Sequence, residues 1–418
     1  MAPGYSLTGI VSDQIMMLNR YGHEPHLFVG DTFPEKNKFP IPENITLHPT
    51  VPRPVLIDYR KKKDLKPDHQ KFIDTYSKQL VEELKPFNLV ITHDWIFTGW
   101  TMPYALVLQE ISKQLPNTLF LHWIHSIPTT RFDWWRLADY GLEKNRIVFP
   151  NGTDAQRVAL QYNCHITNVS VIPHIKDLRT WFDFSDGACD IINKLPSLMT
   201  AEVVQVYPAS TDRLEAKRAD MVIKLFAEIK KQGKSVCLLF ANQEARNLDK
   251  YTVKWKNLDA LYKLGEKLGL IRGVDFEFIS GLDYLNGLAK RELRELFLCS
   301  NLFVYPTREE SFGLVAPEAA LSGAKLMVLN ADLRMLAEVN CNTGMYAQFG
   351  SYTSRIKPEQ ESFFVETAKE IIEKFDADMA IQSATSMRRR LNYDTIYKYF
   401  YLPVIKEVET MLKINHIL

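Results

Sequence analysis

The sequence lacks the features that mark several large classes of protein. Its five cysteines are odd in number, widely spaced and free of any CxxC pair, which argues against a disulfide framework or a cysteine-bound metal. No stretch reaches about 18 uninterrupted apolar residues, and the N-terminus has neither a basic start nor an apolar signal core. We therefore expect no transmembrane segment and a cytoplasmic protein whose thiols stay reduced.

Several catalytic signatures are missing as well. No GxGxxG follows an expected strand, and neither GxxxxGK[ST] nor GxSxG is present, which disfavours nicotinamide enzymes, P-loop kinases and α/β-hydrolases. The 51 basic and 50 acidic residues leave a formal net charge of +1. No global field therefore attracts nucleic acid or an anionic membrane, and any polyanion must be bound by a local patch.

What the sequence does contain is an alternation of short apolar runs with helical patterns over 418 residues. This alternation is typical of strands joined by crossover helices, so two α/β domains with parallel sheets are predicted. The first series of strands runs from HEPHLFVG to NVSVIPHI, and the second opens with AEVVQVYP. The predicted boundaries are 1–180 for the N-terminal domain, 181–200 for a linker, 201–392 for the C-terminal domain and 393–418 for a final helix that crosses between them.

The N-terminus is unusual for such a domain, which normally opens with a strand. MAPGYSLTG is typical of the loop after a strand, so we expect that the first strand is missing or that the chain begins late. A helix is predicted from Ile10 to Tyr21, ending at Gly22, where a helix C-terminus favours positive φ.

The segment 301–330, NLFVYPTREESFGLVAPEAALSGAKLMVLN, carries the strongest functional signal. It predicts a buried strand, a loop with Glu310, a helix with Glu318, a glycine stop and a second strand, with seven residues between the two glutamates. A loop at the carboxyl end of a parallel strand lies where open α/β sheets bind ligands. The amides around Gly313, at a helix N-terminus, favour phosphate and sugar oxygens, and glycine permits close backbone approach.

This combination of Glu-x7-Glu, internal Phe-Gly and following helix resembles the donor site of glycosyltransferase family 4. The resemblance implies a GT-B fold, in which two Rossmann-like, doubly wound domains face a central cleft, and it implies transfer with retention at the anomeric carbon. It assigns the N-terminal domain to the acceptor and the C-terminal domain to the nucleotide-sugar. By the same resemblance Glu310 contacts donor-sugar hydroxyls and Glu318 accepts hydrogen bonds from the ribose, while Phe312, Gly313 and Leu314 form the turn that binds the donor.

Cations are needed beside a diphosphate leaving group, because negative charge develops on its oxygens. Lys217-Arg218-Ala219-Asp220 resembles the Lys-Gly-x-Asp helix opening of the family, although Arg218 replaces the usual glycine. The resemblance gives Arg213 and Lys217 the diphosphate, with Arg218 as the alternative arginine. Gly9 is a further candidate, whose backbone would approach the donor phosphates from the first loop.

Histidines follow two of the strands expected in the N-terminal domain. The family often has a histidine facing the donor sugar at the end of the strand TLFLHWIH, and His125 fits that position better than His122, which lies within the strand pattern. His93, with the adjacent Asp94 and Trp95, is expected to line the acceptor side of the cleft.

We expect neither a metal nor a bound cofactor, and a nucleotide-diphosphate sugar, with UDP-sugars favoured, as co-substrate. Asp376-Ala377-Asp378 imitates an Asp-x-Asp metal motif but lies in an amphipathic helical pattern rather than after a strand, so surface charge is the preferred interpretation.

The acceptor stays open between a saccharide, a lipid-linked or small molecule, and DNA. The DNA alternative, a phage-type enzyme in a host cytoplasm acting on hydroxymethylated bases, depends on basic and aromatic side chains in the first domain. These side chains are the basic run at residues 60–63 and the aromatic residues Phe132, Trp134 and Trp135, followed by Arg136.

Two further alternatives are a non-catalytic GT-B module that binds nucleotide-sugar and a GT-B epimerase that needs no acceptor.

Overall fold

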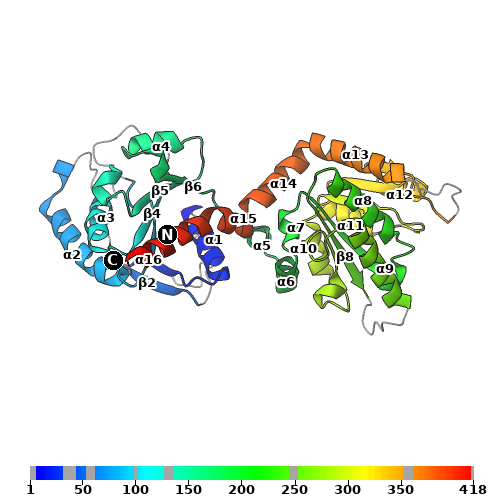
Figure 1. Cartoon of the computed structure of the whole chain (residues 1–418), viewed down its shortest axis with the longest axis horizontal. Helices are drawn as coiled ribbons and strands as arrows, with labels where there is room; N and C mark the ends of the chain where they lie inside the picture. Colours follow the sequence, from blue (N-terminus) through cyan, green and yellow to red (C-terminus); the bar gives the residue numbers. More distant parts are fainter. Residues whose placement is uncertain are drawn as a thin grey trace. The chain divides into compact units, whose positions relative to one another are not determined.

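The chain folds into two compact units in a computed structural model. Unit 1 comprises Met1–Lys176 with Tyr393–Leu418, and unit 2 comprises Asp177–Asn392. Both consist of parallel strands with helices packed on them, as Figure 1 shows, so the predicted α/β class with two Rossmann-like domains is confirmed. The structure describes residues 6–31, 44–52, 62–97, 102–126, 136–243, 253–352 and 361–415.

Unit 1 contains a two-stranded sheet, β1-β2, and a four-stranded sheet in the order β3-β4-β5-β6, all parallel. Consecutive parallel strands in spatial order require a crossover after each strand, and helices supply several of these connections. The strands are β1 (His26–Gly30), β2 (Thr46–Val51), β3 (Leu89–His93), β4 (Leu119–Trp123), β5 (Asn145–Phe149) and β6 (Val169–Val171). The helices before unit 2 are α1 (Ser6–Arg20), α2 (Pro67–Leu84), α3 (Met102–Gln114) and α4 (Ala155–Gln161).

The C-terminal segment returns to unit 1, visible in red in Figure 1. It contains α15 (Tyr393–Ile396), a π-helical turn at Tyr397–Tyr401 and α16 (Leu402–Asn415). Gln14 of α1 donates a 2.7 Å hydrogen bond to the hydroxyl of Tyr401. The rings of Tyr21 and Tyr397 stack with centroids 3.7 Å apart. These contacts fasten the last helices to the first.

Unit 2 is built on parallel strands, six of which lie in the residues that the structure describes. Two three-stranded ladders have the orders β7-β8-β9 and β10-β11-β12. The side chain of Gln205 in β7 joins them, because it donates to the carbonyl of Val304 in β10 at 3.0 Å and accepts from the Val304 amide at 2.9 Å. The strands are β7 (Val203–Ser210), β8 (Val236–Gln243), β9 (Phe276–Phe278), β10 (Leu302–Tyr305), β11 (Leu326–Asn330) and β12 (Met345–Ala347).

Counted along the chain, the strands of unit 2 therefore lie in the order 3-2-1-4-5-6. In this Rossmann order the sheet grows to one side from β7 and to the other side from β10, so the switch point lies between β7 and β10. Ligands of such sheets bind beyond the carboxyl ends of the strands at that switch point. The helices are α5 (Leu178–Trp181), α6 (Asp186–Lys194), α7 (Ser197–Thr200), α8 (Ala219–Lys231), α9 (Val253–Lys267), α10 (Lys290–Phe297), α11 (Val315–Ser322), α12 (Arg334–Val339), α13 (Glu361–Ala377) and α14 (Met379–Leu391).

The apolar runs of the sequence explain why these strands form. Every residue of β10 is buried, as are the first seven of β7, and strands covered on both faces are typically continuous in apolar residues rather than alternating. Two strands were not predicted, β2 and β12, because their sequences TLHPTV and MYA are too polar or too short to stand out.

The linker expected at 181–200 is instead helical. Helices α6 and α7 fall in it, and Ile191, Leu195 and Leu198 are fully buried in the core of unit 2. Turn-forming residues such as Ser185, whose side chain caps α6, resemble a linker in sequence. The boundary between the units lies at Lys176 and Asp177, before these helices.

The first helix begins earlier than predicted, at Ser6, which places Gly9 in its first turn rather than in a loop. Leu7, Val11 and Ile15, spaced by four residues, pack with β1, and this apolar face extends the helix toward the N-terminus. A Cβ at Gly9 would meet nothing within 4 Å, so no close neighbour requires glycine at this position.

Two general properties can be read from the described ranges. No helix within them combines the length and apolar character needed to cross a bilayer. All five cysteines are free, with Cys237 and Cys299 buried in unit 2 and Cys341 exposed.

Candidate functional site

The loops that follow β7 and β10 meet at the switch point of unit 2. The loop after β7 holds Arg213 and Lys217, and the loop after β10 holds Glu309 and Glu310. A backbone hydrogen bond of 3.0 Å from the Arg308 amide to the carbonyl of residue 216 ties the two loops together. Charged side chains about one hundred residues apart in sequence are thereby gathered where a Rossmann sheet binds its ligand.

Lys217, Tyr305 and Glu310 form what we call the switch-point cluster. The Lys217 ammonium contacts the Glu310 carboxylate directly, and it lies 3.1 Å from the hydroxyl of Tyr305. The Tyr305 hydroxyl in turn donates to Glu310. The side chains of Lys217 and Glu310 are only 16% and 15% exposed, so water screens this ion pair much less than a surface pair.

Burial also affects the titration of the lysine. Burial and the positive charge of Arg213 lower the pKa of Lys217 to about 8, and Glu309 opposes them. The Glu310 carboxylate in direct contact favours the charged ammonium. The cluster therefore holds a cation and an anion next to each other, and both side chains are largely shielded from solvent.

Arg213 and Glu309 form an outer pair beside the cluster. Their guanidinium and carboxylate lie 3.2 Å apart, and both side chains are about half exposed. This geometry separates the two adjacent glutamates, because Glu309 faces solvent with Arg213 whereas Glu310 faces inward. An exposed pair contributes little to stability, so Arg213 is free to exchange its partner for a ligand anion.

Arg218 occupies a backbone position that favours glycine. It precedes α8 with φ of 55°, in the left-handed region that costs a side-chain-bearing residue about 1 kcal/mol or more. Its side chain bonds to the carboxylate of Asp220 at 3.2 Å and to the carbonyl of Phe349 at 3.3 Å. It is only 12% exposed, so these partners already engage the guanidinium.

The turn after Glu310 leads into α11. Gly313 has φ of 76°, a conformation that favours glycine, and a Cβ there would crowd the side chain of Leu336 at 3.2 Å. Phe312 and Leu314 on either side are 51% and 64% exposed. Within the described part of the chain, no hydrogen bond or ion pair engages the carboxylate of Glu318 in the first turn of α11.

In unit 1 the carboxyl ends of three strands bring together His93, His125 and His174, which we call the histidine cluster. His93 Nδ1 lies 2.9 Å from His125 Nε2, and the rings of His125 and His174 stack with centroids 5.3 Å apart. Asp94 accepts from the amide of His125 at 2.8 Å and from Ser126 at 3.3 Å, which fixes the loop that carries His125.

Burial keeps this cluster uncharged near neutral pH. It lowers the pKa of His93 to about 3, with His125 and His174 adding to the decrease. It lowers the pKa of His125 and of His174 to about 4. The Nδ1 atoms of His125 and His174 are buried and without a hydrogen-bond partner within the described ranges. These two nitrogens are buried polar atoms of the cluster that a ligand can engage.

His122, the alternative to His125, has a structural environment. Within β4 its two ring nitrogens bond to Thr92 at 2.9 Å and to Asn145 at 2.8 Å, and its side chain is fully buried. Burial lowers its pKa to about 4. It links β3, β4 and β5 and leaves no ring nitrogen for a ligand.

Other predicted candidates lie elsewhere. Asp378 caps α14 by accepting from the amides of Ala380 and Ile381, and Asp376 pairs with Lys234 at 2.7 Å, so both carboxylates have structural partners. Across the described ranges, no group of three or more His, Cys, Asp or Glu residues is placed to hold a metal ion.

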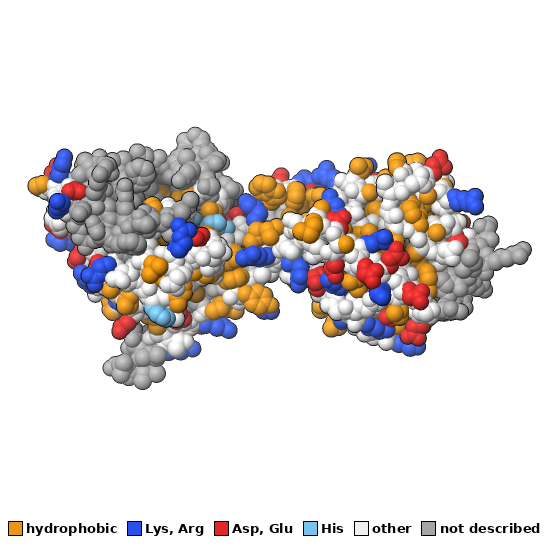
Figure 2. Space-filling model, turned by 90° about the horizontal axis from the view of Figure 1, so that it is seen from above, with side chains coloured by type: hydrophobic (Ala, Val, Ile, Leu, Met, Phe, Trp, Pro, Cys, Tyr) orange, Lys and Arg blue, Asp and Glu red, His pale blue; other side chains and the backbone are white. Residues whose placement is uncertain are grey.

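The basic and aromatic residues on which the DNA alternative depends lie largely outside the described residues. Residues 60 and 61 and the aromatic residues at 132, 134 and 135 belong to ranges that the structure does not describe. Lys63 follows in a short 3₁₀ helix, Lys62–Asp64. On the face of unit 2 drawn in Figure 2, acidic and basic side chains are interspersed, and no basic field of one sign covers it.

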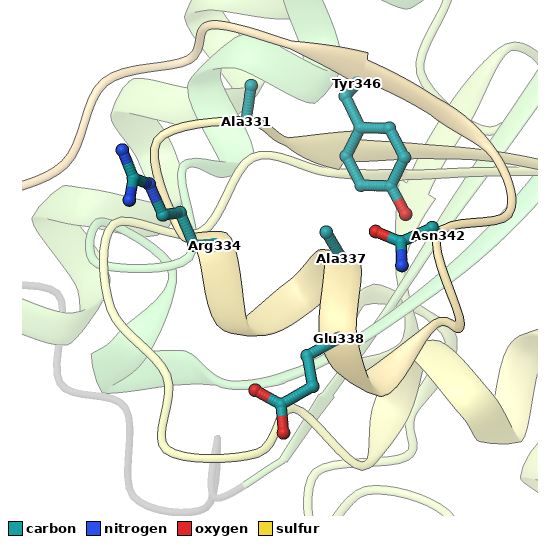
Figure 3. A pocket seen from close by; sticks show the side chains of 6 residues that line it. All are labelled: Ala331, Arg334, Ala337, Glu338, Asn342 and Tyr346. Carbon is teal, nitrogen blue, oxygen red and sulfur yellow. The ribbon is translucent and has the colours of Figure 1, made fainter.

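A shallow pocket of about 520 Å³ lies on the outer side of α12. Leu336, on the inner side of this helix, lies 3.2 Å from where a Cβ added to Gly313 would be. Arg334 and Glu338 of the same helix line the pocket. Figure 3 shows Tyr346 and Asn342 on one side of the pocket and Arg334 on the other. The pocket therefore adjoins the Gly313 turn through α12 but contains none of the predicted site residues.

Two contributors were not singled out from the sequence. Tyr305 and His174 each lie at the carboxyl end of an expected strand or just beyond it, and that position was the available signal. Tyrosine and histidine are common in buried cores, so position alone did not separate them from structural residues.

Comparison of the sequence with models of known families finds no match, and comparison with curated proteins finds none either. Among solved structures, the chain is similar to a glycosyltransferase from Rickettsia africae, with 14% identity, coverage of 97% of this chain and 94% of that one, and a TM-score of 0.33. It is similar to Anabaena Alr3699/HepE in complex with UDP-glucose, with 14% identity, coverage of 97% and 98%, and a TM-score of 0.33. It is also similar to a UDP-forming α,α-trehalose-phosphate synthase from Burkholderia xenovorans in complex with glucose-6-phosphate, with 12% identity, coverage of 82% and 77%, and a TM-score of 0.34. At these values, a functional assignment depends on the side chains of the chain itself.

Proposed function

We propose that the chain is a retaining glycosyltransferase of the GT-B type resembling family 4, which moves a sugar from a nucleotide-diphosphate donor onto an acceptor hydroxyl. One observation carries this proposal: Lys217 and Glu310 meet at the switch point of a Rossmann-ordered sheet. A phosphate-binding cation and a sugar-binding carboxylate side by side suit the two halves of a nucleotide-sugar. UDP-sugars are the favoured donors.

Each residue of the site has a role in this proposal. Lys217 and the exposed Arg213 stabilise the departing diphosphate, and amides of the turn at Gly313 add donors at the N-terminus of α11. Glu310 orients the donor sugar through its hydroxyls rather than forming a covalent intermediate. Glu318, whose carboxylate has no side-chain partner within the described ranges, accepts hydrogen bonds from the ribose.

The reaction needs no metal in this proposal, because Lys217 and Arg213 supply positive charge where a divalent cation would otherwise act. The proton of the acceptor hydroxyl passes to an oxygen of the leaving diphosphate. In unit 1 the neutral ring of His125 faces sugar hydroxyls. A neutral imidazole both donates and accepts, which suits a polyhydroxylated ligand. The acceptor in this proposal is a saccharide, a lipid-linked or a small molecule, in the cytoplasm.

The proposal is tested by product analysis with a matched pair of variants. The chain is incubated with UDP-sugars crossed with saccharide, lipid and hydroxymethylated DNA acceptors, and the anomeric configuration of any product is read by NMR. Glu310→Gln is expected to lower turnover more than nucleotide affinity, because its partner is the sugar. Glu309→Gln removes a neighbouring carboxylate that is half exposed, and it should leave turnover within twofold.

Several results would contradict the proposal. If Glu310→Gln changes neither turnover nor nucleotide affinity by more than twofold, the motif assignment is wrong. Epimerisation of donor without acceptor would indicate an epimerase, and nucleotide-sugar binding without any turnover would indicate a non-catalytic module. Transfer to hydroxymethylated DNA alone would establish the phage-type alternative.

A further inference from the structure

Tyr305, the last residue of β10, touches three parts of the candidate donor site. Its hydroxyl lies 3.1 Å from the Lys217 ammonium and donates to the Glu310 carboxylate. The Lys217 nitrogen lies 5.4 Å from the centroid of its ring. A Cβ on Gly313 would lie 3.5 Å from the same ring, so the turn that leads into α11 passes beside it. One side chain therefore contacts the cation, the carboxylate and the turn.

The packing around Tyr305 holds its hydroxyl in place. The side chain is 1% exposed, and its ring packs against Phe303 and Tyr207, with centroids 5.6 and 6.1 Å away. The hydroxyl of Tyr207 donates to the backbone carbonyl of Lys217 at 2.6 Å. Two tyrosines thus hold Lys217, one by its backbone and the other by its ammonium.

The chemistry of the phenol suits a shared contact. It donates one hydrogen bond and accepts others, so it serves a carboxylate and an ammonium at once. Burial raises the pKa of Tyr305, which keeps its hydroxyl protonated. When a donor enters, the Glu310 carboxylate takes sugar hydroxyls and Lys217 takes the diphosphate, so their direct contact is lost.

We propose that Tyr305 is a positioning residue that keeps Lys217 and Glu310 aligned with each other while donor replaces their direct contact. This inference rests on the proposed function. It predicts that the hydroxyl matters for turnover rather than for nucleotide binding, because transition-state charge is stabilised only by groups already in place.

The first test is Tyr305→Phe, which removes the hydroxyl and keeps the ring. We expect kcat for transfer from the UDP-sugar that the wild type uses to fall at least about tenfold, since small misplacement of catalytic groups is costly. The Kd for UDP, measured by calorimetry, should stay within twofold.

The matched control is Tyr262→Phe in the same unit. The Tyr262 hydroxyl donates to the buried Glu277, and Arg272 lies 3.8 Å over its ring, so a tyrosine, a carboxylate and a cation are again combined, away from the switch point. Tyr262→Phe should leave kcat within twofold.

A second test separates positioning from packing. In a Lys217→Ala background, Tyr305→Phe should lower kcat by a smaller factor than it does in the wild type, because the hydroxyl then has Glu310 alone left to position. A readout without turnover is the NMR titration of Lys217 labelled at Cε. In Tyr305→Phe the midpoint of this titration should move by at least about 0.5 pH units, the order of magnitude expected for one hydrogen bond. In Tyr262→Phe the midpoint should not move.

The outcomes distinguish this inference from the function on which it rests. If Glu310→Gln and Lys217→Ala lose turnover but Tyr305→Phe keeps it, or if the double variant is fully additive, the positioning role is overturned and the function stands. An unchanged Lys217 titration in Tyr305→Phe overturns the role as well. If Glu310→Gln and Lys217→Ala keep full turnover, the proposed function itself fails.

Discussion

All ten histidines of the chain belong to unit 1, and unit 2, which holds the switch-point cluster, has none. Both units place polar side chains at the carboxyl ends of parallel strands, but the chemistry differs. Unit 1 presents neutral imidazoles from β3 and from the segments after β4 and β6, whereas unit 2 presents a partly buried lysine and glutamate. Neutral donors and acceptors suit hydroxyls, and fixed charges suit a diphosphate. The two edges therefore differ in the ligand that each can hold and in their response to pH.

The largest expected effect is selective loss of unit 1 in acid. Burial lowers the pKa values of His93, His122, His125 and His174 to about 3 or 4, against about 6.5 for an unfolded chain. The unfolded state then binds more protons, so this stabilisation is complete above pH 6.5 and is lost as pH falls toward 4. With about 1.4 kcal/mol per pKa unit, the loss is on the order of several kcal/mol.

Hydrogen exchange by mass spectrometry measures this loss in each unit. Peptides covering β3 and β4 should lose protection between pH 6.5 and 4.5, after correction for intrinsic exchange rates, while those covering β7 and β10 keep it. Unit 2 has no histidine, so acid acts on it only once carboxylates are protonated, near pH 4. His165→Ala, which removes an exposed histidine, is the control and should change neither unit. Simultaneous loss of protection in both units would show that the two units do not differ in their stability to acid.

A second test asks whether the nucleotide belongs to unit 2. Glu318→Ala should weaken UDP binding by about 1.5–3 kcal/mol, because the ribose diol loses charged hydrogen-bond acceptors. Isothermal calorimetry measures the change. Glu338→Ala, which removes an exposed carboxylate from the pocket on α12, is the control and should bind UDP normally. Unchanged affinity in Glu318→Ala would remove this carboxylate from the site.

A third, smaller effect concerns the cation. Lys217→Ala should lower turnover at least about tenfold, on the scale of losing one preorganised charge beside the leaving group. Lys224→Ala is a suitable control, because Lys224 lies on α8, where it pairs with Asp220 at 3.6 Å and lies 5.4 Å from the ring centroid of Phe364. Steady-state kinetics of both variants decide the matter, and equal turnover in the two would place the diphosphate elsewhere.

The smallest expected effect is that of chelation. If Lys217 and Arg213 act in place of a metal, as proposed, turnover in excess EDTA should match that of the untreated protein within twofold. A strict requirement for divalent cations, restored by adding Mg²⁺ or Mn²⁺ after EDTA, would contradict this expectation. It would also reopen the role of Asp376 and Asp378.

The positions of the strands could be predicted from the sequence far better than the boundary between the two units. The run ending in Tyr305 was visible as an apolar strand, because burial on both faces leaves a continuous signal. The run ending in His93 was visible from its apolar residues, although Thr92 is the only buried residue of that strand. The segment at 181–200 was mistaken for a linker, since short capped helices share turn-forming residues with loops. Gly9 was expected in a loop because a lone glycine gives no indication of which residues pack around the helix that contains it.

By itself the sequence determined the α/β class, the strand-loop-helix around Glu310 and the candidates Lys217 and His125, because all of these depend on local patterns along the chain. The tertiary structure alone decided which residues meet. β7 and β10 are adjacent only because the strand order reverses between them, so no local pattern relates Lys217 to Tyr305. The histidine cluster likewise depends on the carboxyl ends of strands far apart in sequence. Contacts between distant segments follow from the packing of the whole sheet, and for that reason they are not written in any single stretch of residues.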